Sequence, residues 1–429
     1  MIFKEIHSSM LNEKMYKIKL DNGLDIFIIP KKNFTKKYAI FGTRYGSIDN
    51  KFKLPGENAA IEMPEGIAHF LEHKLFESEE GGVFNRFSKL GSNVNAYTNF
   101  NSTCYLFSCT DKFYENLSIL VDFVQSPYLT DENVEKEKGI IEQEIRMYED
   151  NPNWKVFFNA LKGLYKEHPV RVDIAGTVES IYKITKEDLY KCYNTFYVPN
   201  NMMICIVGDV DKDETISTIE KNLKESFKKL EGNVERILPK EDENINMKKI
   251  EENLSVSMPL FNIAFKDNNI GLKNKELLEK DIQTKIILDM LFGKSSNLYK
   301  KLYDDGLINE NFENEYTFDI TYGHSMIGGE SKEPKKVYDM ICSEIDKIKK
   351  EGLNSKDFER VKKKMIGQHI MYYNSVEFIA NMFTSYYFKG INLFDYIDVL
   401  NKMNIEEVSS RFEKHFDIEK SVISIINPN

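Results

Sequence analysis

The chain has 429 residues, of which 41% are hydrophobic and 29% are charged, and its formal net charge at pH 7 is -10. This composition is typical of folded globular proteins and excludes disordered, collagen-like and coiled-coil chains. The acidic excess disfavours a nucleic-acid binder, and the absence of any apolar run of about eighteen residues predicts no membrane span.

The N-terminal stretch and the cysteines suggest a cellular compartment. The first residues lack the apolar core of a secretory signal. The five cysteines show no C-x-x-C spacing, so we interpret them as reduced core residues. We therefore expect a cytoplasmic protein.

The first half predicts strands and helices in alternation. Asp21-Asn22-Gly23 is a strong hairpin turn between two apolar strands. Gly91 is expected to end a helix, and an acidic first turn is typical of a helix start. The predicted strands are 16–20, 24–29, 38–45, 94–109 and 202–207. The predicted helices are 67–76, 83–90, 113–124, 130–148, 154–165, 179–196 and 213–230.

The second half repeats this style after a charged stretch at 231–249 that lacks an apolar period. The predicted strands are 256–265, 315–327 and 421–426, and the predicted helices are 276–292, 297–303, 335–350, 356–373 and 376–389. This order predicts an α+β fold of two similar domains, each a mostly antiparallel sheet with helices packed on one face. We place the domains at 1–235 and 250–429, with a linker at 236–249. No residue-level repeat is strong enough to prove the likeness.

The chemistry concentrates in one segment, His69-Phe70-Leu71-Glu72-His73, within the first predicted helix. Residues i and i+4 lie on one helical face, so His69 and His73 can hold the same metal ion. Glu72 borders that face, where it can take a proton from a water that the metal acidifies. This donor set suits zinc, and H-x-x-E-H is the inverted zincin motif. The alternative is a pair of solvated or hydrogen-bonded core histidines.

A third ligand is expected from the acidic helix predicted at 130–148. Glu137, Ile141 and Glu144 share one helical face, whereas Glu142 lies on another. A carboxylate beside Ile141 should be buried, and Glu142 should be solvated. Periodicity therefore favours Glu144 or Glu137 without deciding between them.

These residues resemble the pitrilysin/insulinase-type inverzincin zinc peptidases, which include mitochondrial processing peptidase, and in length the chain resembles compact bacterial members. The resemblance covers the whole chain. Leu20-Asp21-Asn22-Gly23-Leu24 is similar to the opening strand turn of the family, and 69–73 matches its metal motif. Gly176-Thr177 and the stretch 199–209 resemble later landmarks of the same domain.

The resemblance implies a role for each residue of the site. His69, His73 and Glu144 would hold zinc, with one ion per chain. Glu72 would be the general base. Glu137 would orient or tune one of the two histidines from behind.

The resemblance also implies a surface for the substrate. The segment 91–98 is similar to the edge strand that binds an extended peptide by main-chain pairing, and Asn95 and Ala96 match its most recognisable positions. Without the resemblance, this segment is an ordinary strand end in which asparagine supplies turn chemistry.

One part of the family's pattern is missing. These peptidases also use an Arg and a Tyr, about seven residues apart in a second domain pair, to bind the carbonyl side and the oxyanion. In the matching segment, 295–309, Leu302 or Tyr303 stands where the Arg is expected and Asn309 where the Tyr is expected. The chain therefore carries the metal half of the site and lacks the oxyanion half.

This departure implies a second chain in the active unit. We expect a related subunit that carries the Arg/Tyr pair, in a heterodimer, although a homodimer is possible. The alternative is that Tyr316, Tyr322 or a lysine of this chain supplies the missing donor.

Two functions are consistent with the sequence. The first is a zinc endopeptidase or peptide-processing enzyme that acts on short or unfolded peptides, with 1–235 as its zinc-binding domain and 250–429 as a similar domain without metal. The second is a non-catalytic, peptide-binding or structural subunit of a hetero-oligomer. The set His69, Glu72, His73 and Glu144 favours the enzyme, because a purely structural subunit would have little reason to keep all four.

Overall fold

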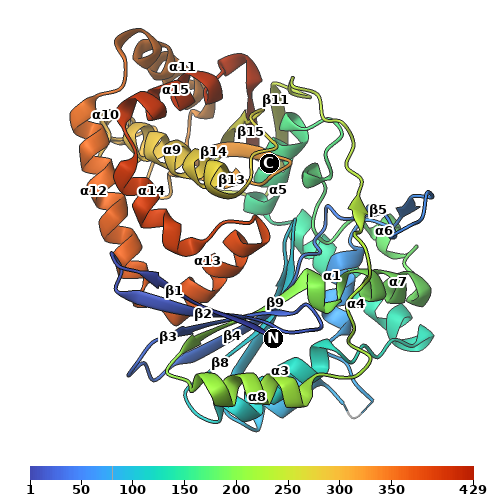
Figure 1. Cartoon of the computed structure of the whole chain (residues 1–429). Coiled ribbons are helices and arrows are strands. Elements are labelled where there is room, and N and C mark those ends of the chain that lie inside the picture. Colours follow the sequence, from blue (N-terminus) through green and yellow to red (C-terminus); the bar gives the residue numbers. More distant parts are fainter. Residues whose placement is uncertain (80) are drawn as a thin grey trace. The chain divides into compact units, whose positions relative to one another are not determined.

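The computed structural model describes residues 1–79 and 81–429, and its packing divides the chain into two compact units (Figure 1). Unit 1 consists of Met1–Ile145, Asp173–Leu238 and Tyr372–Phe388, and unit 2 of Arg146–Val172, Pro239–Met371 and Lys389–Asn429. Each unit thus contains one segment from the other half of the sequence. The predicted domains at 1–235 and 250–429 follow the sequence halves, and these boundaries stay a prediction.

Unit 1 contains a large sheet and a small one. Its strands are β1 (Ile2–Ser8), β2 (Glu13–Lys19), β3 (Asp25–Pro30), β4 (Lys37–Thr43), β5 (Lys51–Lys53), β6 (Ile61–Glu62), β7 (Asn93–Thr98), β8 (Thr103–Cys109), β9 (Met202–Gly208) and β10 (Glu235–Arg236). The large sheet has the order β1-β2-β3-β9-β4-β8-β7, and the small one the order β10-β5-β6. In the large sheet β3 and β9 run parallel, and the other neighbours are antiparallel.

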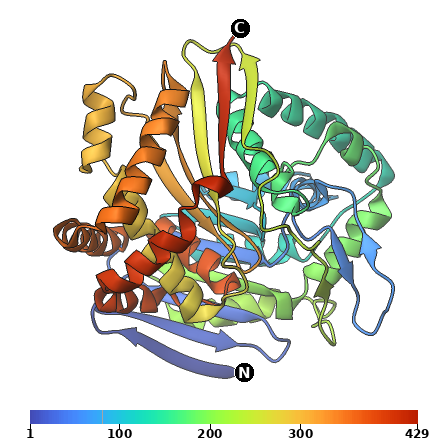
Figure 2. The ribbon, with the colours of Figure 1, turned by 90° about the horizontal axis from the view of Figure 1, so that it is seen from above.

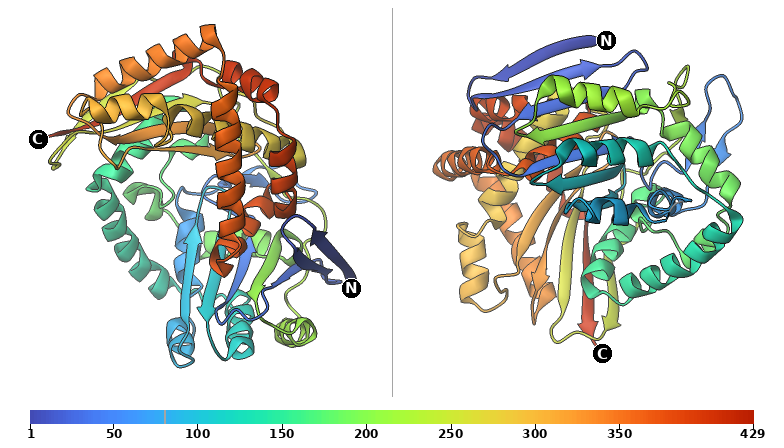
Figure 3. Two further views of the ribbon diagram at one scale, coloured as in Figure 1. Left: turned by 90° about the vertical axis from the view of Figure 1, so that its left-hand side faces the viewer. Right: turned by 90° about the horizontal axis from the view of Figure 1, so that it is seen from below.

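Helices cover both faces of this large sheet. They are α1 (Ile67–Lys74), α2 (Val83–Ser88), α3 (Phe113–Val124), α4 (Asp131–Glu149, as far as residue 145), α6 (Val178–Ile181), α7 (Lys186–Phe196), η2 (Pro199–Asn201), α8 (Lys212–Asn222) and α13 (Val376–Phe388). Ile26 and Ile28 point into the main core with α1 and α3, and α3 packs beside α8 (Figure 3). Phe27, which points to the opposite face, packs against Phe383 of α13 with ring centroids 4.7 Å apart.

Unit 2 is built on one sheet of five strands. They are β11 (Lys249–Leu254), β12 (Leu260–Lys266), β13 (Glu313–Phe318), β14 (Gly323–Glu330) and β15 (Ser421–Pro428). Its helices are α5 (Pro152–Leu164), η1 (Pro169–Arg171), α9 (Asn274–Phe292), α10 (Asn297–Asp304), α11 (Pro334–Glu351), α12 (Ser355–Tyr372), η3 (Leu393–Asp395), α14 (Tyr396–Lys402), α15 (Ile405–His415) and η4 (Ile418–Lys420). Figure 2 shows β15 in red between two yellow strands of this sheet.

The two units share one strand topology. In unit 2 the order is β11-β15-β12-β14-β13, with β11 and β15 parallel and the other neighbours antiparallel. In unit 1 the core β3-β9-β4-β8-β7 has the same order and the same directions. In each case the first and fifth strands pair in parallel at one side, and the third strand forms the other edge. The predicted α+β fold of two similar, mostly antiparallel halves is confirmed. Helices were expected on one face of each sheet, whereas in unit 1 α13 also covers the face opposite the main core.

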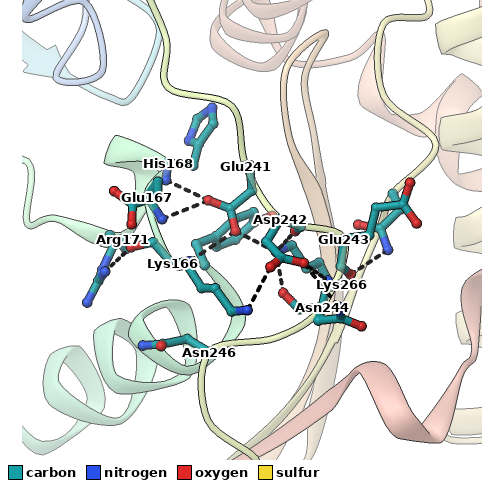
Figure 4. A network of polar contacts seen from close by, with 12 residues as sticks. Lys166, Glu167, His168, Arg171, Glu241, Asp242, Glu243, Asn244, Asn246 and Lys266 are labelled. Atoms are coloured by element: carbon teal, nitrogen blue, oxygen red, sulfur yellow. Dashed lines mark hydrogen bonds and ion pairs between the residues drawn. The ribbon is translucent and has the colours of Figure 1, made fainter.

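The segment predicted as a linker is held firmly against unit 2 (Figure 4). The carboxylate of Glu241 accepts hydrogen bonds from the backbone N–H groups of Lys166, Glu167 and His168, at 3.0, 2.8 and 2.7 Å. The same carboxylate lies 2.6 Å from the ammonium of Lys266. Residues 239–248 therefore belong to the packed structure of unit 2.

Several elements differ from the predicted ones. The stretch 94–109, predicted as one strand region, is the hairpin of β7 and β8, and 315–327 is the hairpin of β13 and β14. The strands β1 and β11 and the helices α14 and α15 were not predicted. Within the described residues, no helix combines the length and the apolar character needed to cross a bilayer. All five cysteines are free thiols, and four of them are buried.

Candidate metal centre

The helix α1 begins at a tightly packed glycine. Gly66 caps it with a φ of 85°, a conformation that glycine adopts without strain. A Cβ on Gly66 would lie 2.2 Å from the carbonyl oxygen of Ala175, and a Cβ on Gly176 would lie 2.6 Å from the carbonyl oxygen of Glu65. Ser180 donates a hydrogen bond to that same oxygen of Glu65. The start of α1 is thus fixed by close backbone contact with the loop that precedes α6.

The structure brings His69 and His73 of α1 together with Glu144 of α4. Candidate ligand atoms of the three side chains all lie within 4.8 Å of one another. Nε2 of His69 is 3.7 Å from one carboxylate oxygen of Glu144, and Nε2 of His73 is 3.5 Å from the other. The two imidazole rings are 4.5 Å apart and steeply inclined, so both can face one point.

These distances fit a zinc ion. Zinc binds imidazole nitrogen at about 2.0–2.1 Å and carboxylate oxygen at about 2.0–2.2 Å, so its tetrahedral ligands lie about 3.3–3.5 Å apart. The measured separations of 3.5 and 3.7 Å are close to that spacing. Two nitrogens and one carboxylate leave a fourth position, as in catalytic zinc sites.

Glu137 supports His73 from behind. One carboxylate oxygen of Glu137, which is 6% exposed, lies 3.0 Å from Nδ1 of His73. A carboxylate is an acceptor only, so Nδ1 carries the proton and Nε2 presents its lone pair toward Glu144. Burial alone would lower the pKa of His73, but the hydrogen bond to Glu137 and the nearby carboxylates raise it. In contrast, Nδ1 of His69 is buried without a hydrogen-bond partner among the described residues.

Glu72 lies beside the cluster and is held by the edge strand. It is 8% exposed, and one of its oxygens accepts a hydrogen bond of 2.7 Å from the hydroxyl of Thr98, the last residue of β7. Burial raises the pKa of Glu72, and the Thr98 bond partly opposes this. Thr98 in turn lies 3.2 Å from the hydroxyl of Thr103 on β8. Sequence reasoning missed Thr98, because the contact joins residues 26 positions apart.

Asn95 and Ala96 lie on β7, the edge strand of the large sheet, which pairs with β8 on its inner side. The side-chain oxygen of Asn95 accepts a hydrogen bond of 2.9 Å from the backbone N–H of Ala96. A peptide that pairs with this edge at Ala96 must therefore displace the Asn95 side chain. The substrate-binding role of the two residues stays a prediction.

The face assignment of α4 agrees with the helical phase predicted for it. Glu137 and Ile141 are buried, and Glu144 points to the histidines. Glu142 lies on a different side of the helix, where it accepts a hydrogen bond of 2.6 Å from the hydroxyl of Tyr182.

In unit 2, the two tyrosines considered as substitute oxyanion donors are buried. Tyr316 is 4% exposed and donates its hydroxyl proton to Asp267 at 2.5 Å, and Tyr322 is 3% exposed. In the segment 295–309, Leu302 is fully buried and Asn309 donates to Glu330. Leu302, Tyr316 and Tyr322 are therefore buried, whereas Tyr303, the other residue at the expected Arg position, is 52% exposed.

The comparisons with known proteins identify the family of the chain. Residues 58–178 match the family model described as insulinase (peptidase family M16), and residues 183–365 match the model described as the peptidase M16 inactive domain. The chain is 43% identical over 427 residues to the uncharacterized zinc protease YmfH of Bacillus subtilis strain 168, with 100% of both chains covered. The chain belongs to peptidase family M16, the pitrilysin/insulinase-type family.

Solved structures share the fold. An M16-like protein of Alicyclobacillus acidocaldarius superposes with a TM-score of 0.95 at 39% identity, over 99% of this chain and 100% of that one. Pitrilysin superposes with a TM-score of 0.77 at 16% identity, which shows the fold alone. That match covers 100% of this chain but 46% of pitrilysin, whose chain is therefore about twice as long.

Proposed function

We propose that the chain is a zinc-dependent endopeptidase, or the metal-bearing subunit of a peptide-processing enzyme, that hydrolyses short or unfolded polypeptides. The observation that carries the proposal is the convergence of His69, His73 and Glu144 with Glu72 beside them. Family membership and the relative named as a zinc protease support it.

Each residue of the site has a proposed role in hydrolysis. Zinc held by His69, His73 and Glu144, one ion per chain, would supply a Lewis acid that acidifies water and polarises the scissile carbonyl. Glu72 takes the proton of the attacking water and later returns it to the leaving amine. Glu137 fixes the ring of His73.

Substrate positioning falls to the edge strand. The main chain of β7 at Asn95 and Ala96 would pair with an extended peptide, a mode that recognises backbone rather than a particular side chain. Such binding suits unfolded segments, because a folded protein seldom offers an unpaired strand.

The decisive test asks whether Glu72 acts as the general base or as a ligand of the metal. Glu72→Gln should keep close to one zinc per chain and lose peptide hydrolysis, because the amide cannot take a proton. The zinc content is measured on the purified chain, and hydrolysis with an unfolded peptide. Loss of zinc together with activity would mean that Glu72 holds the metal. A full zinc complement in a wild-type chain that never hydrolyses peptide, with or without a partner, would favour the non-catalytic scaffold.

We also propose that the active unit contains a related subunit with the Arg/Tyr pair. Removing one oxyanion donor typically costs about 10²–10³ in rate, and this chain has Leu302 or Tyr303 where the Arg is expected and Asn309 where the Tyr is expected. Tyr316 and Tyr322 are buried in unit 2, which argues against substitution by these two tyrosines, and a lysine of this chain stays the alternative. A homodimer would add only further copies of the same residues.

The partner proposal is tested by reconstitution. Hydrolysis is assayed with the chain alone and then with a paralogue that has the Arg/Tyr pair and lacks the zinc motif. We expect the mixture to exceed the sum of the two by at least about 10². Full turnover by the lone chain, with no gain from the paralogue, contradicts the heterodimer.

A further inference from the structure

A fully buried lysine lies directly behind the candidate metal centre. Lys74 follows His73 at the end of α1, and its exposed fraction is 0%. Lysine is almost never fully buried unless it is paired, because an ammonium loses its hydration there. The partners of Lys74 therefore indicate what the residue does.

Its partners lie just after α1 and on α4. The ammonium of Lys74 is 2.7 Å from the carboxylate of Glu77 and 3.6 Å from that of Glu137, and it donates a hydrogen bond of 3.1 Å to the carbonyl oxygen of Asn133. Asn133 and Glu137 belong to α4, the helix that also carries Glu144. Lys74 thus links the helix of the two histidines to the helix of the carboxylate.

Glu137 connects Lys74 to His73 of the candidate metal centre. One oxygen of Glu137 faces Lys74, and the other lies 3.0 Å from Nδ1 of His73. The three side chains form a series, Lys74–Glu137–His73, whose last atom, Nε2 of His73, lies 3.5 Å from Glu144. With both of its oxygens engaged, Glu137 has little freedom to turn away from His73.

We propose that Lys74 is a positioning residue of the metal centre: it holds Glu137 of α4 against His73 of α1. The inference rests on the proposed zinc site. It adds a residue outside the H-x-x-E-H motif, on which zinc affinity depends through Glu137. The competing explanation is a structural ion pair between Lys74 and Glu77.

A matched control exists on α4. Lys138 is also buried, at 5% exposure, and pairs with Glu135 at 2.6 Å and with the carbonyl oxygen of Tyr182 at 3.2 Å. None of these partners belongs to the candidate centre. Lys138→Met therefore removes a buried, paired ammonium from the helix that carries Glu137 and should leave zinc affinity unchanged.

The experiment measures zinc affinity of the full-length chain by competition with a chelator. Loss of an outer partner of a metal ligand typically weakens affinity about 10–100-fold. Glu137 is such a partner, and because Lys74 acts through it we expect Lys74→Met to weaken zinc affinity by up to about tenfold. In a Glu137→Gln background the same change should add less than about twofold, because its route to His73 is already cut. The visible spectrum of the cobalt-substituted chain should shift for Lys74→Met but not for Lys138→Met.

Three results would overturn the inference: unchanged zinc affinity in Lys74→Met, an equal loss in Lys138→Met, or losses that multiply in the double variant. If Lys74→Met fails to fold, Lys74→Gln keeps a donor for Asn133 and is judged by the same readouts. A wild-type chain that binds no zinc refutes the proposed function itself, and is recognised before any variant is compared.

Discussion

The close backbone contact at Gly66 leads to a quantitative prediction for Gly66→Ala. An alanine at a φ of 85° loses about 1–2 kcal/mol relative to a favoured conformation. Its Cβ would also lie 2.2 Å from the carbonyl oxygen of Ala175, a backbone atom that cannot rotate away. Overpacking of this kind typically costs about 1–3 kcal/mol. The sum is about 2–5 kcal/mol of unit 1 stability. Relief of the clash would displace Gly66, which caps α1 three residues before His69.

Gly91→Ala is the matched control for this prediction. Gly91 also has a positive φ, of 70°, but a Cβ there would meet nothing within 4 Å. It therefore carries the conformational cost without the contact. Hydrogen exchange of unit 1 amides is the suitable assay, because the single tryptophan, Trp154, lies in unit 2. Gly66→Ala should destabilise unit 1 by about 1–3 kcal/mol more than Gly91→Ala and weaken zinc binding. Equal effects of the two changes would refute the packing argument.

Three further predictions concern the site and unit 2. Thr98→Val should lower kcat about tenfold at unchanged zinc content while Thr98→Ser retains most of it, because the hydroxyl holds the general base; equal kcat values would contradict this role. Glu144→Gln should strongly weaken zinc affinity and Glu142→Gln should do little, and the reverse result would mean that the helical phase is wrong. Burial lowers the pKa of His324 from 6.5 to about 3, so below pH 6.5 the unfolded chain binds a proton that the folded chain does not. As the pH is lowered below 6.5, His324 should therefore reduce the stability of unit 2 by up to about 1.4 kcal/mol per pH unit. Trp154 fluorescence measures this stability, which should fall less steeply with pH in His324→Gln.

The helical periodicity of α1 and α4 was sufficient to predict which residues face the candidate site. Both helices are amphipathic, so apolar neighbours such as Ile141 reveal the buried side and place Glu137 and Glu144 on it. Sequence alone could not choose between these two carboxylates, because both lie on that face. The structure separates them by distance: Glu144 approaches both Nε2 atoms, and Glu137 approaches Nδ1 of His73.

The missed features depend on contacts between distant residues. The strands β1 and β11 are edges of their sheets, with polar side chains at most positions, so they lack the apolar alternation that identifies a strand. The helix α5 comes from the first half of the sequence but belongs to unit 2, and α13 comes from the second half but belongs to unit 1. The sequence could not predict this, because a helix has the same apolar face whichever sheet it covers. Likewise, Lys74 reads as a surface residue until its partners on α4 are known.

The two units show why a shared topology leaves no repeat in the residues. Strand order depends on the pattern of apolar positions, which many residues satisfy, whereas each polar interior requires particular side chains. In unit 2 the buried carboxylate of Asp267 lies 2.8 Å from Arg411 and 3.2 Å from Lys280, so cations of the chain itself neutralise it. In unit 1 the carboxylate of Glu144 faces His69 and His73, which we propose to hold zinc. The same strand topology thus surrounds a carboxylate with cationic side chains in unit 2 and with histidines in unit 1. A few polar side chains account for this difference.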